Sequence, residues 1–239
     1  MATPPTHSSD LWMHSLAPRR ANAEAPAVEP TPAEASLAVA RPRGYEGLDH
    51  ETLGSDLLAV QQALTFPFSV LGPARTRQMA TVRPEAWYPI RDMLGLIDFL
   101  DSKLGAVGLL ALGKTIFRIS VTPEAKERLK CARDVIFALD SMYRHTNRGA
   151  KIGAWSVISF APGRVELVKT TPHHCVMEEG ILLEALASVQ VPVTITQSRC
   201  LRRGDDHCRF ILTSVVTDQR WGSAGSVAAP AGHGSSDAE

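Results

Sequence analysis

The sequence lacks a long hydrophobic run, because the longest uncharged apolar stretch, residues 104–113, is too short to span a bilayer. It also lacks an excess of charge, since 25 basic residues balance 25 acidic ones and leave no basic field for nucleic acid or anionic lipid. The first 40 residues contain no apolar segment typical of a signal peptide. The sequence therefore predicts a cytoplasmic protein that binds no nucleic acid and no membrane.

The motifs typical of a nucleotide cofactor are also missing. The chain contains no Gly-x-Gly-x-x-Gly fingerprint, no phosphate-binding P-loop and no compact acid and base pair set apart from surface charge. The sequence therefore predicts no nucleotide cofactor, and it favours a binding protein over an enzyme.

Both ends of the chain have little hydrophobic patterning. Residues 1–45 are rich in Pro, Ala, Ser and Glu, and residues 219–239 are rich in Gly, Ser and Ala, with Trp221 as the last anchoring side chain. Such segments cannot recover the entropy lost on ordering. We therefore expect two disordered tails around one folded domain, residues 46–218, which is long enough to bury a full core.

The first half of this domain has the periodicity of helices, with apolar residues at steps of three and four. The expected helices cover residues 53–63, 90–104, about 107–117, and 122 to between 145 and 149. Pro67 closes the first helix and Gly105 ends the second. Thr122 caps the last helix, which contains Cys131 as a packed side chain.

After Gly149 the period changes from 3.6 to 2, which is typical of strands. Two hairpins are expected, over residues 154–169 and 191–212, with a helix over 176–189 between them. This order predicts an α+β domain in which N-terminal helices pack on an antiparallel sheet built from two hairpins separated by a helix.

Three of the four cysteines lie between residues 173 and 210. If the second hairpin turns at Gly204, Cys200 faces Cys208, and their Cβ atoms are roughly 4.5–5.5 Å apart. In a reducing compartment such a pair indicates metal ligands or free thiols more often than a structural disulfide.

The arrangement of these residues resembles the 4-vinyl reductase (4VR) domain. The shared frame is a cysteine before a helix with Glu-Gly, a strand ending in cysteine, and Gly-Asp-x-x-Cys-x-Phe, here Cys175, Glu179, Gly180, Cys200, Gly204, Asp205, Cys208 and Phe210. The resemblance implies the fold that this family shares with the ligand-binding domain of NO-sensing haem proteins and with small subunits of the TRAPP trafficking complex. The preceding helices and hairpin agree with the family in order.

In the aromatic-sensing relatives, the cysteines hold a structural zinc together with a Glu three residues before the second cysteine. That position is Gln197 here, a poor zinc ligand, and residues three apart on a regular strand point to opposite faces unless a bulge intervenes. The three cysteines supply three of the four ligands that zinc prefers, and His174 or His173 offers the fourth. Alternatively, the cysteines are small buried hydrophobic residues without metal. The Tyr-x-Ser-x-Arg signature of the haem-binding relatives is absent, so no haem is expected.

A ligand site is expected between the helices and the first hairpin. Trp155 and Phe160 either line an apolar pocket there or fill the core. Tyr143 and His145, near the end of the preceding helix, supply polar groups at its mouth. The position of His145 is similar to that of the ligand-contacting His of the aromatic sensors, although a His at a helix end also interacts with the macrodipole.

These observations favour a sensor domain that binds a small apolar or aromatic ligand and signals through an output protein on another chain. Residues 90–104 are apolar over a broad arc, so a homodimer is expected. The alternatives are a non-catalytic homodimeric assembly subunit of TRAPP-like fold, and a reductase or auxiliary factor in tetrapyrrole synthesis, as the family name implies.

Overall fold

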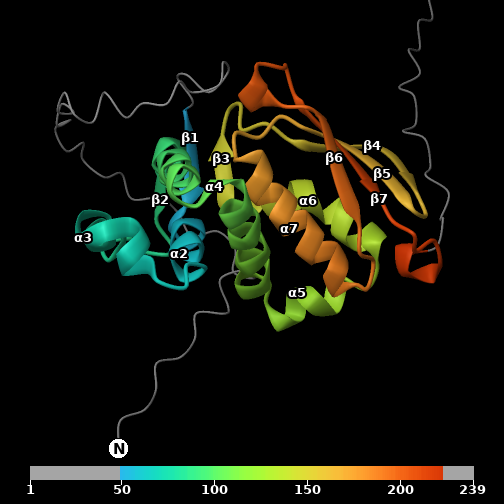
Figure 1. The fold of residues 1–239 in the computed structure, drawn as a ribbon, viewed down its shortest axis with the longest axis horizontal. Helices are drawn as coiled ribbons and strands as arrows, with labels where there is room; N and C mark the ends of the chain where they lie inside the picture. Colours follow the sequence, from blue (N-terminus) through green and yellow to red (C-terminus); the bar gives the residue numbers. More distant parts are fainter. Residues whose placement is uncertain (1–48, 223–239) are drawn as a thin grey trace, which may run out of the picture.

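The computed structural model describes residues 49–222, and most of the two predicted tails lies outside this range. Trp221, near its end, is fully buried. In chain order the elements are β1 (His50–Leu53), α2 (Gly54–Gln62), α3 (Pro67–Met79), β2 (Trp87–Pro89), α4 (Ile90–Ser120), α5 (Pro123–Arg128), α6 (Ala132–Thr146), β3 (Asn147–Gly149), β4 (Trp155–Ala161), β5 (Arg164–Lys169), α7 (Cys175–Ser188), β6 (Thr194–Arg199), η2 (Leu201–Arg203), β7 (Cys208–Thr213) and η3 (Gln219–Trp221) (Figure 1).

The helices and strands form the expected α+β fold, with two antiparallel sheets in place of one. The larger sheet has the strand order β4-β5-β7-β6, so the two predicted hairpins join through β5 and β7. Helices α6 and α7 lie between this sheet and the N-terminal helices (Figure 1). The smaller sheet, in the order β2-β1-β3, is not predicted by the sequence, because its strands of three or four residues are too short to show alternation.

A proline and a glycine set the helix ends of the N-terminal half. Pro67 does not close α2, which ends at Gln62, but is the first residue of α3, a helix that the periodicity did not predict. Proline suits this position because the first N–H groups of a helix have no partner within it. Gly105 breaks the long helix as predicted, since its φ of 63° interrupts α4 between two helical halves.

The predicted helix from Thr122 onward is two helices. The Thr122 side chain caps α5 as expected, accepting a hydrogen bond from the Ala125 N–H at 3.2 Å. The chain then leaves the helix, and α6 begins after Cys131 because the Asp134 carboxylate accepts hydrogen bonds from the Lys130 and Cys131 N–H groups, at 2.8 and 3.1 Å. Cys131 is therefore an N-cap residue and does not lie inside a helix.

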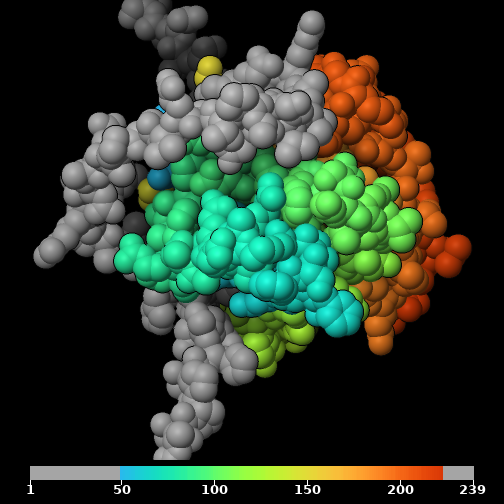
Figure 2. Space-filling model, turned by 60° about the vertical axis from the view of Figure 1, so that its left-hand side comes forward, coloured from blue at the N-terminus to red at the C-terminus, as the bar shows by residue number. Residues whose placement is uncertain are grey.

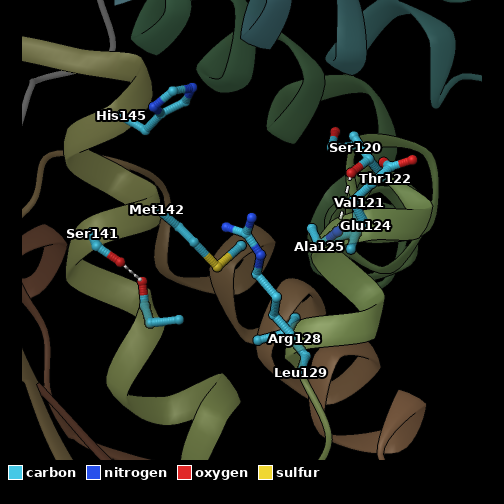
Figure 3. Close-up of a pocket in the computed structure, with 11 residues that line it drawn as sticks. Ser120, Val121, Thr122, Glu124, Ala125, Arg128, Leu129, Ser141, Met142 and His145 are labelled. Atoms are coloured by element: carbon cyan, nitrogen blue, oxygen red, sulfur yellow. Dashed lines mark hydrogen bonds between the residues drawn. The ribbon is translucent and has the colours of Figure 1, made fainter. Parts of the chain in front are cut away.

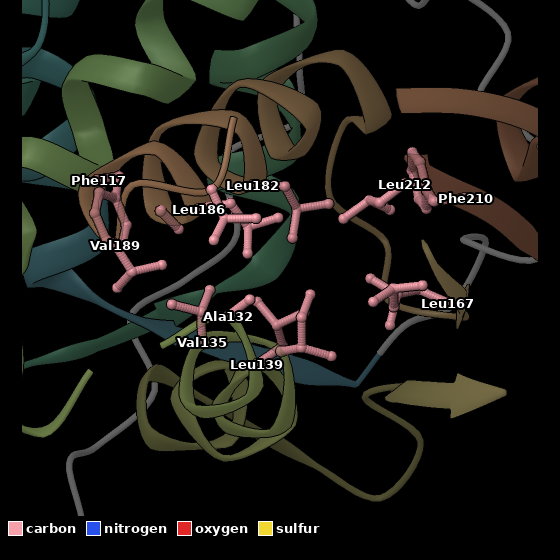
Figure 4. Packing of buried hydrophobic residues seen from close by; sticks show 14 of the residues in the cluster. Phe117, Ala132, Val135, Leu139, Leu167, Leu182, Leu186, Val189, Phe210 and Leu212 are labelled. Atoms are coloured by element: carbon pink, nitrogen blue, oxygen red, sulfur yellow. The ribbon is translucent and has the colours of Figure 1, made fainter. Parts of the chain in front are cut away.

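Two hydrophobic clusters fill the interior, and both α4 and α7 contribute to each of them. One lies between α6, α7 and the larger sheet, where Leu139, Leu182 and Leu212 are among the buried side chains (Figure 4). The other packs α2 and α3 on the first half of α4. Figure 2 shows these N-terminal helices at the centre of one face, with the C-terminal strands at its edge.

Helices α4 and α7 cross at two glycines and form the most extensive helix contact of the fold. A Cβ atom at Gly113 would lie closer than 3.0 Å to the Met177 carbonyl oxygen. A Cβ atom at Gly180 would clash in the same way with the Leu110 carbonyl oxygen. Only glycine at both positions lets the two backbones approach this closely.

The apolar arc of residues 90–104 is covered by the chain itself. Leu94, Leu96, Ile97 and Leu100 are buried in the N-terminal cluster, and the Arg75 guanidinium lies 3.8 Å from the centre of the Phe99 ring. This helix therefore offers no exposed apolar surface for the expected homodimer, because the residues that would form that surface are internal. No helix within residues 49–222 combines the length and the apolar character that crossing a membrane requires.

Candidate functional site

The three C-terminal cysteines lie close together in the interior, whereas the hairpin predicted only that Cys200 faces Cys208. The Cys175 sulfur lies 3.2 Å from the Cys208 sulfur and 3.5 Å from the Cys200 sulfur, and all three side chains are buried free thiols. These residues form the cysteine cluster. Within residues 49–222, the cysteine cluster is the one group of at least three His, Cys, Asp or Glu side chains that are close enough to share a metal ion.

The loop between β6 and β7 positions two of these sulfurs. It is longer than the predicted three-residue turn, since η2 follows Cys200 and Gly204 adopts a φ of 94°. The Asp205 carboxylate accepts a hydrogen bond from the Cys200 N–H at 2.6 Å, and the Leu201 N–H donates to the Cys208 sulfur at 3.3 Å. The Gly-Asp pair of the motif thus orients Cys200 toward Cys208.

Gln197 also faces this region, because a β-bulge shifts the register between Gln197 and Arg199. The bulge places residues three apart on the same side of the strand. The Gln197 Nε2 is buried, and a hydrogen bond from the Gln197 side chain helps to lower the pKa of Cys175. His174, the predicted fourth ligand, lies elsewhere: its Nδ1 accepts from the Val176 N–H at 3.3 Å, and its Nε2 lies 3.4 Å from an Asp101 carboxylate oxygen.

A fully buried lysine accompanies the cysteine cluster. The Lys169 ammonium forms an ion pair with Glu178, donates to the His173 carbonyl oxygen at 2.6 Å, and lies 3.9 Å from the Cys175 sulfur. The pKa of Cys175 is lowered to about 4, first because Cys208 donates a hydrogen bond to its sulfur and also because Lys169 is close. Cys175 is therefore a thiolate, the form of cysteine that binds metal ions.

A second feature is a partly open cavity of about 160 Å³, the inner cavity, lined by residues of α2, α4, α6, β4 and α7. Its apolar side is formed by Met93, Ile116, Phe117, Leu139, Ile181 and Leu182. Its polar side is formed by Asp56, Tyr143, Thr146, Asn147, His173 and Glu178. An apolar wall with a few converging polar groups is typical of a small-molecule site.

Hydrogen bonds fix the tautomer of His173 on the polar side. The Asn147 amide nitrogen donates to the Tyr143 carbonyl oxygen and the Thr146 hydroxyl, at 3.0 and 3.1 Å, which leaves its Oδ1 as an acceptor 3.3 Å from His173 Nε2. His173 Nε2 must then carry the proton. Burial, with Lys169 nearby, lowers the His173 pKa to about 3, so the ring is neutral. Its Nδ1 lone pair is buried and has no partner among the described side chains.

Asp56 is a carboxyl group of the inner cavity whose pKa is shifted. Burial raises its pKa to about 7, and a hydrogen bond with Thr146 opposes this shift. Because the folded pKa lies above the ordinary value of 3.8, the ionised carboxylate destabilises the fold. The protonated carboxyl group therefore stabilises the folded protein relative to the ionised one. This contribution is fully present below pH 3.8 and is lost as pH rises through about 7.

Asp56→Asn should therefore stabilise the protein above pH 7 by about 2 kcal/mol, less than the full shift implies because the side chain is partly exposed. Urea unfolding of both proteins from pH 3.5 to 8 measures this difference, which should vanish at the acid end. Parallel stability curves for the two proteins would contradict the raised pKa.

The residues predicted to bind a ligand are divided between sites. Tyr143 and Trp155 line the inner cavity, where the Tyr143 hydroxyl donates to the Ile152 carbonyl oxygen at 2.5 Å and the Trp155 ring stacks on Phe210 at 5.8 Å. Phe160 does not line it and packs its ring against those of Phe137 and Trp221, at 5.5 and 5.6 Å. His145 borders a different pocket, on the other side of α6.

Sequence reasoning missed Lys169, Asp56 and the role of His173 in this region. A signal for Lys169 was present, because it continues the inward phase of Val165 and Leu167 along β5 and is buried as they are. No such signal marked Asp56, which looks like the first-turn acid of an amphipathic helix.

Comparison with known proteins finds H-NOX structures among the structural neighbours. No family model matches the chain, and no curated protein matches it. An H-NOX protein from S. oneidensis, a triple mutant in the Fe(II) ligation state, has a TM-score of 0.56 at 12% identity over 70% of this chain and 98% of that chain. An unliganded Fe(II) H-NOX mutant from K. algicida has a TM-score of 0.54 at 12% identity over 68% and 96%.

These findings correct two expectations. The assignment to the 4VR domain and to TRAPP-like subunits is wrong, because the neighbours are H-NOX domains. The expected cofactor set, zinc without haem, is also contradicted, because the neighbours are sensors that hold haem iron, in the Fe(II)NO state in another S. oneidensis structure.

The residues of the inner cavity fit a haem poorly in the described conformation. His173 is of a type that serves as an axial ligand, and its Nδ1 lone pair is available. However, 160 Å³ is below the roughly 300–1,000 Å³ of most ligand pockets, and a haem is a large ligand. Its propionates would also meet Asp56 and Glu178, with no Lys or Arg among the described lining residues. The chain has the fold of the H-NOX domains, and the likeness is one of fold alone.

Proposed function

We propose that this chain is a sensor domain whose inner cavity binds a small, mainly apolar molecule and reports its presence to a separate output protein. The observation that carries the proposal is the cavity itself, with apolar walls and an unpaired His173 Nδ1 on its polar side. Its volume of about 160 Å³ is close to that of an engineered cavity of about 150 Å³ that binds benzene. The ligand is therefore the size of a single aromatic ring.

The polar side favours a ligand that donates one hydrogen bond. His173 Nδ1 is an acceptor because the proton is on Nε2, and Glu178 and Asp56 add carboxylate oxygens to the same wall. A buried acceptor without a partner costs free energy, which a ligand hydroxyl or N–H would recover. A ring that carries a hydroxyl matches both sides of the cavity.

The cysteine cluster serves as a structural clip in this proposal. Three sulfurs within 4.8 Å of one another suit a divalent ion that prefers thiolate ligands. Gln197, which hydrogen-bonds Cys175, is a candidate for the fourth ligand. A divalent ion with three thiolates carries one net negative charge, and the buried Lys169 ammonium, which is also paired with Glu178, lies 3.9 Å from the Cys175 sulfur. The clip fixes the start of α7, the helix that also lines the inner cavity.

Phenol and toluene, added to the purified chain at saturating concentration, should raise its melting temperature, with the larger shift for phenol. A ligand at 100 times its Kd stabilises the folded state by about 2.7 kcal/mol. Ile181→Phe, which fills the inner cavity, should abolish the shift. Ile158→Phe makes the same change on the exposed face of β4 and should leave it intact.

Two results would count against this function. If neither compound shifts the melting temperature of the wild-type chain, the cavity is not a site for one-ring ligands. If added haem remains bound through desalting and gives a Soret band that Ile181→Phe removes, the cavity opens to a porphyrin and the ligand class is different.

A further inference from the structure

The polar side of the inner cavity carries charge of one sign. Asp56 and Glu178 place carboxyl groups there, and no Arg or Lys is among the described residues of the lining. The pocket that His145 borders, between α5 and α6, differs in this respect, because Arg128 belongs to its lining (Figure 3). Since like charges repel and opposite charges attract, the inner cavity is suited to a cation and unsuited to an anion.

The two carboxyl groups of the inner cavity are not equivalent. Glu178 forms an ion pair with the fully buried Lys169 and accepts a hydrogen bond from the Thr171 hydroxyl at 3.2 Å. Asp56 has no such cation: burial raises its pKa, and the opposing contribution comes from a hydrogen bond with Thr146 and not from a neighbouring Lys or Arg. A carboxylate withdrawn from water without a counter-charge costs free energy, which a cationic ligand beside it would recover.

A network of hydrogen bonds connects Asp56 with His173 along this side. The Asn147 amide nitrogen donates to the Thr146 hydroxyl oxygen at 3.1 Å, so the hydroxyl proton remains for the Asp56 carboxylate. At the other end, Asn147 Oδ1 accepts from His173 Nε2, which leaves the buried His173 Nδ1 without a partner among the described residues. Both ends of the network thus present acceptors, and a ligand that meets either end must supply a donor.

We propose that the inner cavity binds a small arylalkylamine in its protonated form, with the ring against the apolar wall and the ammonium group beside Asp56. An ammonium group has N–H donors and no acceptor, which matches a wall of acceptors. Its positive charge is the counter-charge that Asp56 lacks. The inference rests on the proposed function, because it needs the inner cavity to bind one aromatic ring. It adds the charge of the ligand and the residue that recognises this charge.

The test compares benzylamine with benzyl alcohol, which has the same ring and length and no charge, by calorimetry on the full chain at pH 8. The amine should bind roughly tenfold more tightly, as expected for a charge-assisted hydrogen bond. Asp56→Asn should weaken the amine roughly five- to tenfold and change the affinity for the alcohol less than about twofold. Asp92→Asn removes the same charge from an exposed position on α4 outside the cavity and should spare both ligands.

The affinity for the amine should also depend on pH. Burial raises the Asp56 pKa to about 7, so the carboxyl group is mostly protonated at pH 5.5 and mostly ionised at pH 8, whereas benzylamine keeps its charge at both. The amine should therefore bind roughly five- to tenfold more tightly at pH 8, and Asp56→Asn should remove this dependence.

The other titratable groups of the lining do not compete over this range. They are Tyr143 on α6, His173 before α7 and Glu178 on α7, while α4 and β4 contribute none. Burial raises the Tyr143 pKa and lowers the His173 pKa, in both cases away from this range. Glu178 remains in its ion pair with Lys169.

The outcomes separate this inference from the proposed function. If the alcohol binds as tightly as the amine, or if Asp56→Asn weakens both equally, the ammonium site is refuted while the inner cavity remains a site for one-ring ligands. The same holds if the amine binds equally at both pH values, if its binding survives Ile181→Phe, or if phenol binds and neither benzyl compound does. If phenol, benzylamine and benzyl alcohol all fail to bind, the proposed function falls and this inference falls with it.

Discussion

Gly113→Ala should destabilise the protein by about 3 kcal/mol, at the upper end of overpacking effects, because the new methyl group meets backbone and not a movable side chain. The obstructing atom is the Met177 carbonyl oxygen on α7, and the Ile181 N–H is next to it. Relief requires α4 and α7 to separate along their whole contact. Thermal or urea unfolding measures the loss, and Gly180→Ala should repeat it from the other helix.

Gly95→Ala is the matched control on the same helix. A Cβ atom at Gly95 meets nothing within 4 Å, so alanine there should stabilise α4 by about 0.5–1 kcal/mol through its better helix propensity. Equal effects at the two positions would show that the close crossing of α4 and α7 is not present in solution.

Cys208→Ser should remove the metal ion from the protein and lower its melting temperature by about 10 °C, which corresponds to about 3 kcal/mol for a domain of this size. The serine hydroxyl is a poor ligand for an ion held by thiolates. Elemental analysis of protein prepared without chelator should find about one divalent ion per chain before the change, and almost none after it.

Cys131→Ser is the control for this experiment, since Cys131 caps α6 and stands apart from the cysteine cluster. It should retain the ion. Wild-type protein that contains no metal, together with an unchanged melting temperature in Cys208→Ser, would leave the three cysteines as packed hydrophobic side chains.

The sequence predicted those elements whose periodicity is long enough to read. The break at Gly105, the Thr122 cap, both hairpins and α7 all follow from local rules about glycine, capping and alternation. The small sheet could not be predicted, because its pairing of β1 with β3 joins residues 97 positions apart and its strands are very short. Local signals do not report such contacts.

The site was predictable in part for the same reason. The proximity of Cys200 and Cys208 followed from the predicted turn at Gly204, whereas Cys175 was singled out only by the motif that resembles the 4VR domain. The direction in which Gln197 points depends on a β-bulge, and no residue type in the strand predicts a bulge at that position. The inner cavity is a space that helices and strands distant in the sequence leave unfilled when they pack together. Such a space can be recognised only in the folded structure. Tyr143 and His145 are two residues apart on α6, and the sequence predicted one site for both. In the structure Tyr143 lines the inner cavity, whereas His145 borders another pocket.

Helix α7 is held at two places, by Cys175 in the cysteine cluster and by the backbone contact at Gly180. The residues between and just after these points, Met177, Glu178 and Ile181, line the inner cavity. A rigid helix held at its end and near its middle can neither slide nor tilt, so α7 is a fixed wall of the inner cavity, and any adjustment to a ligand must come from the elements opposite it.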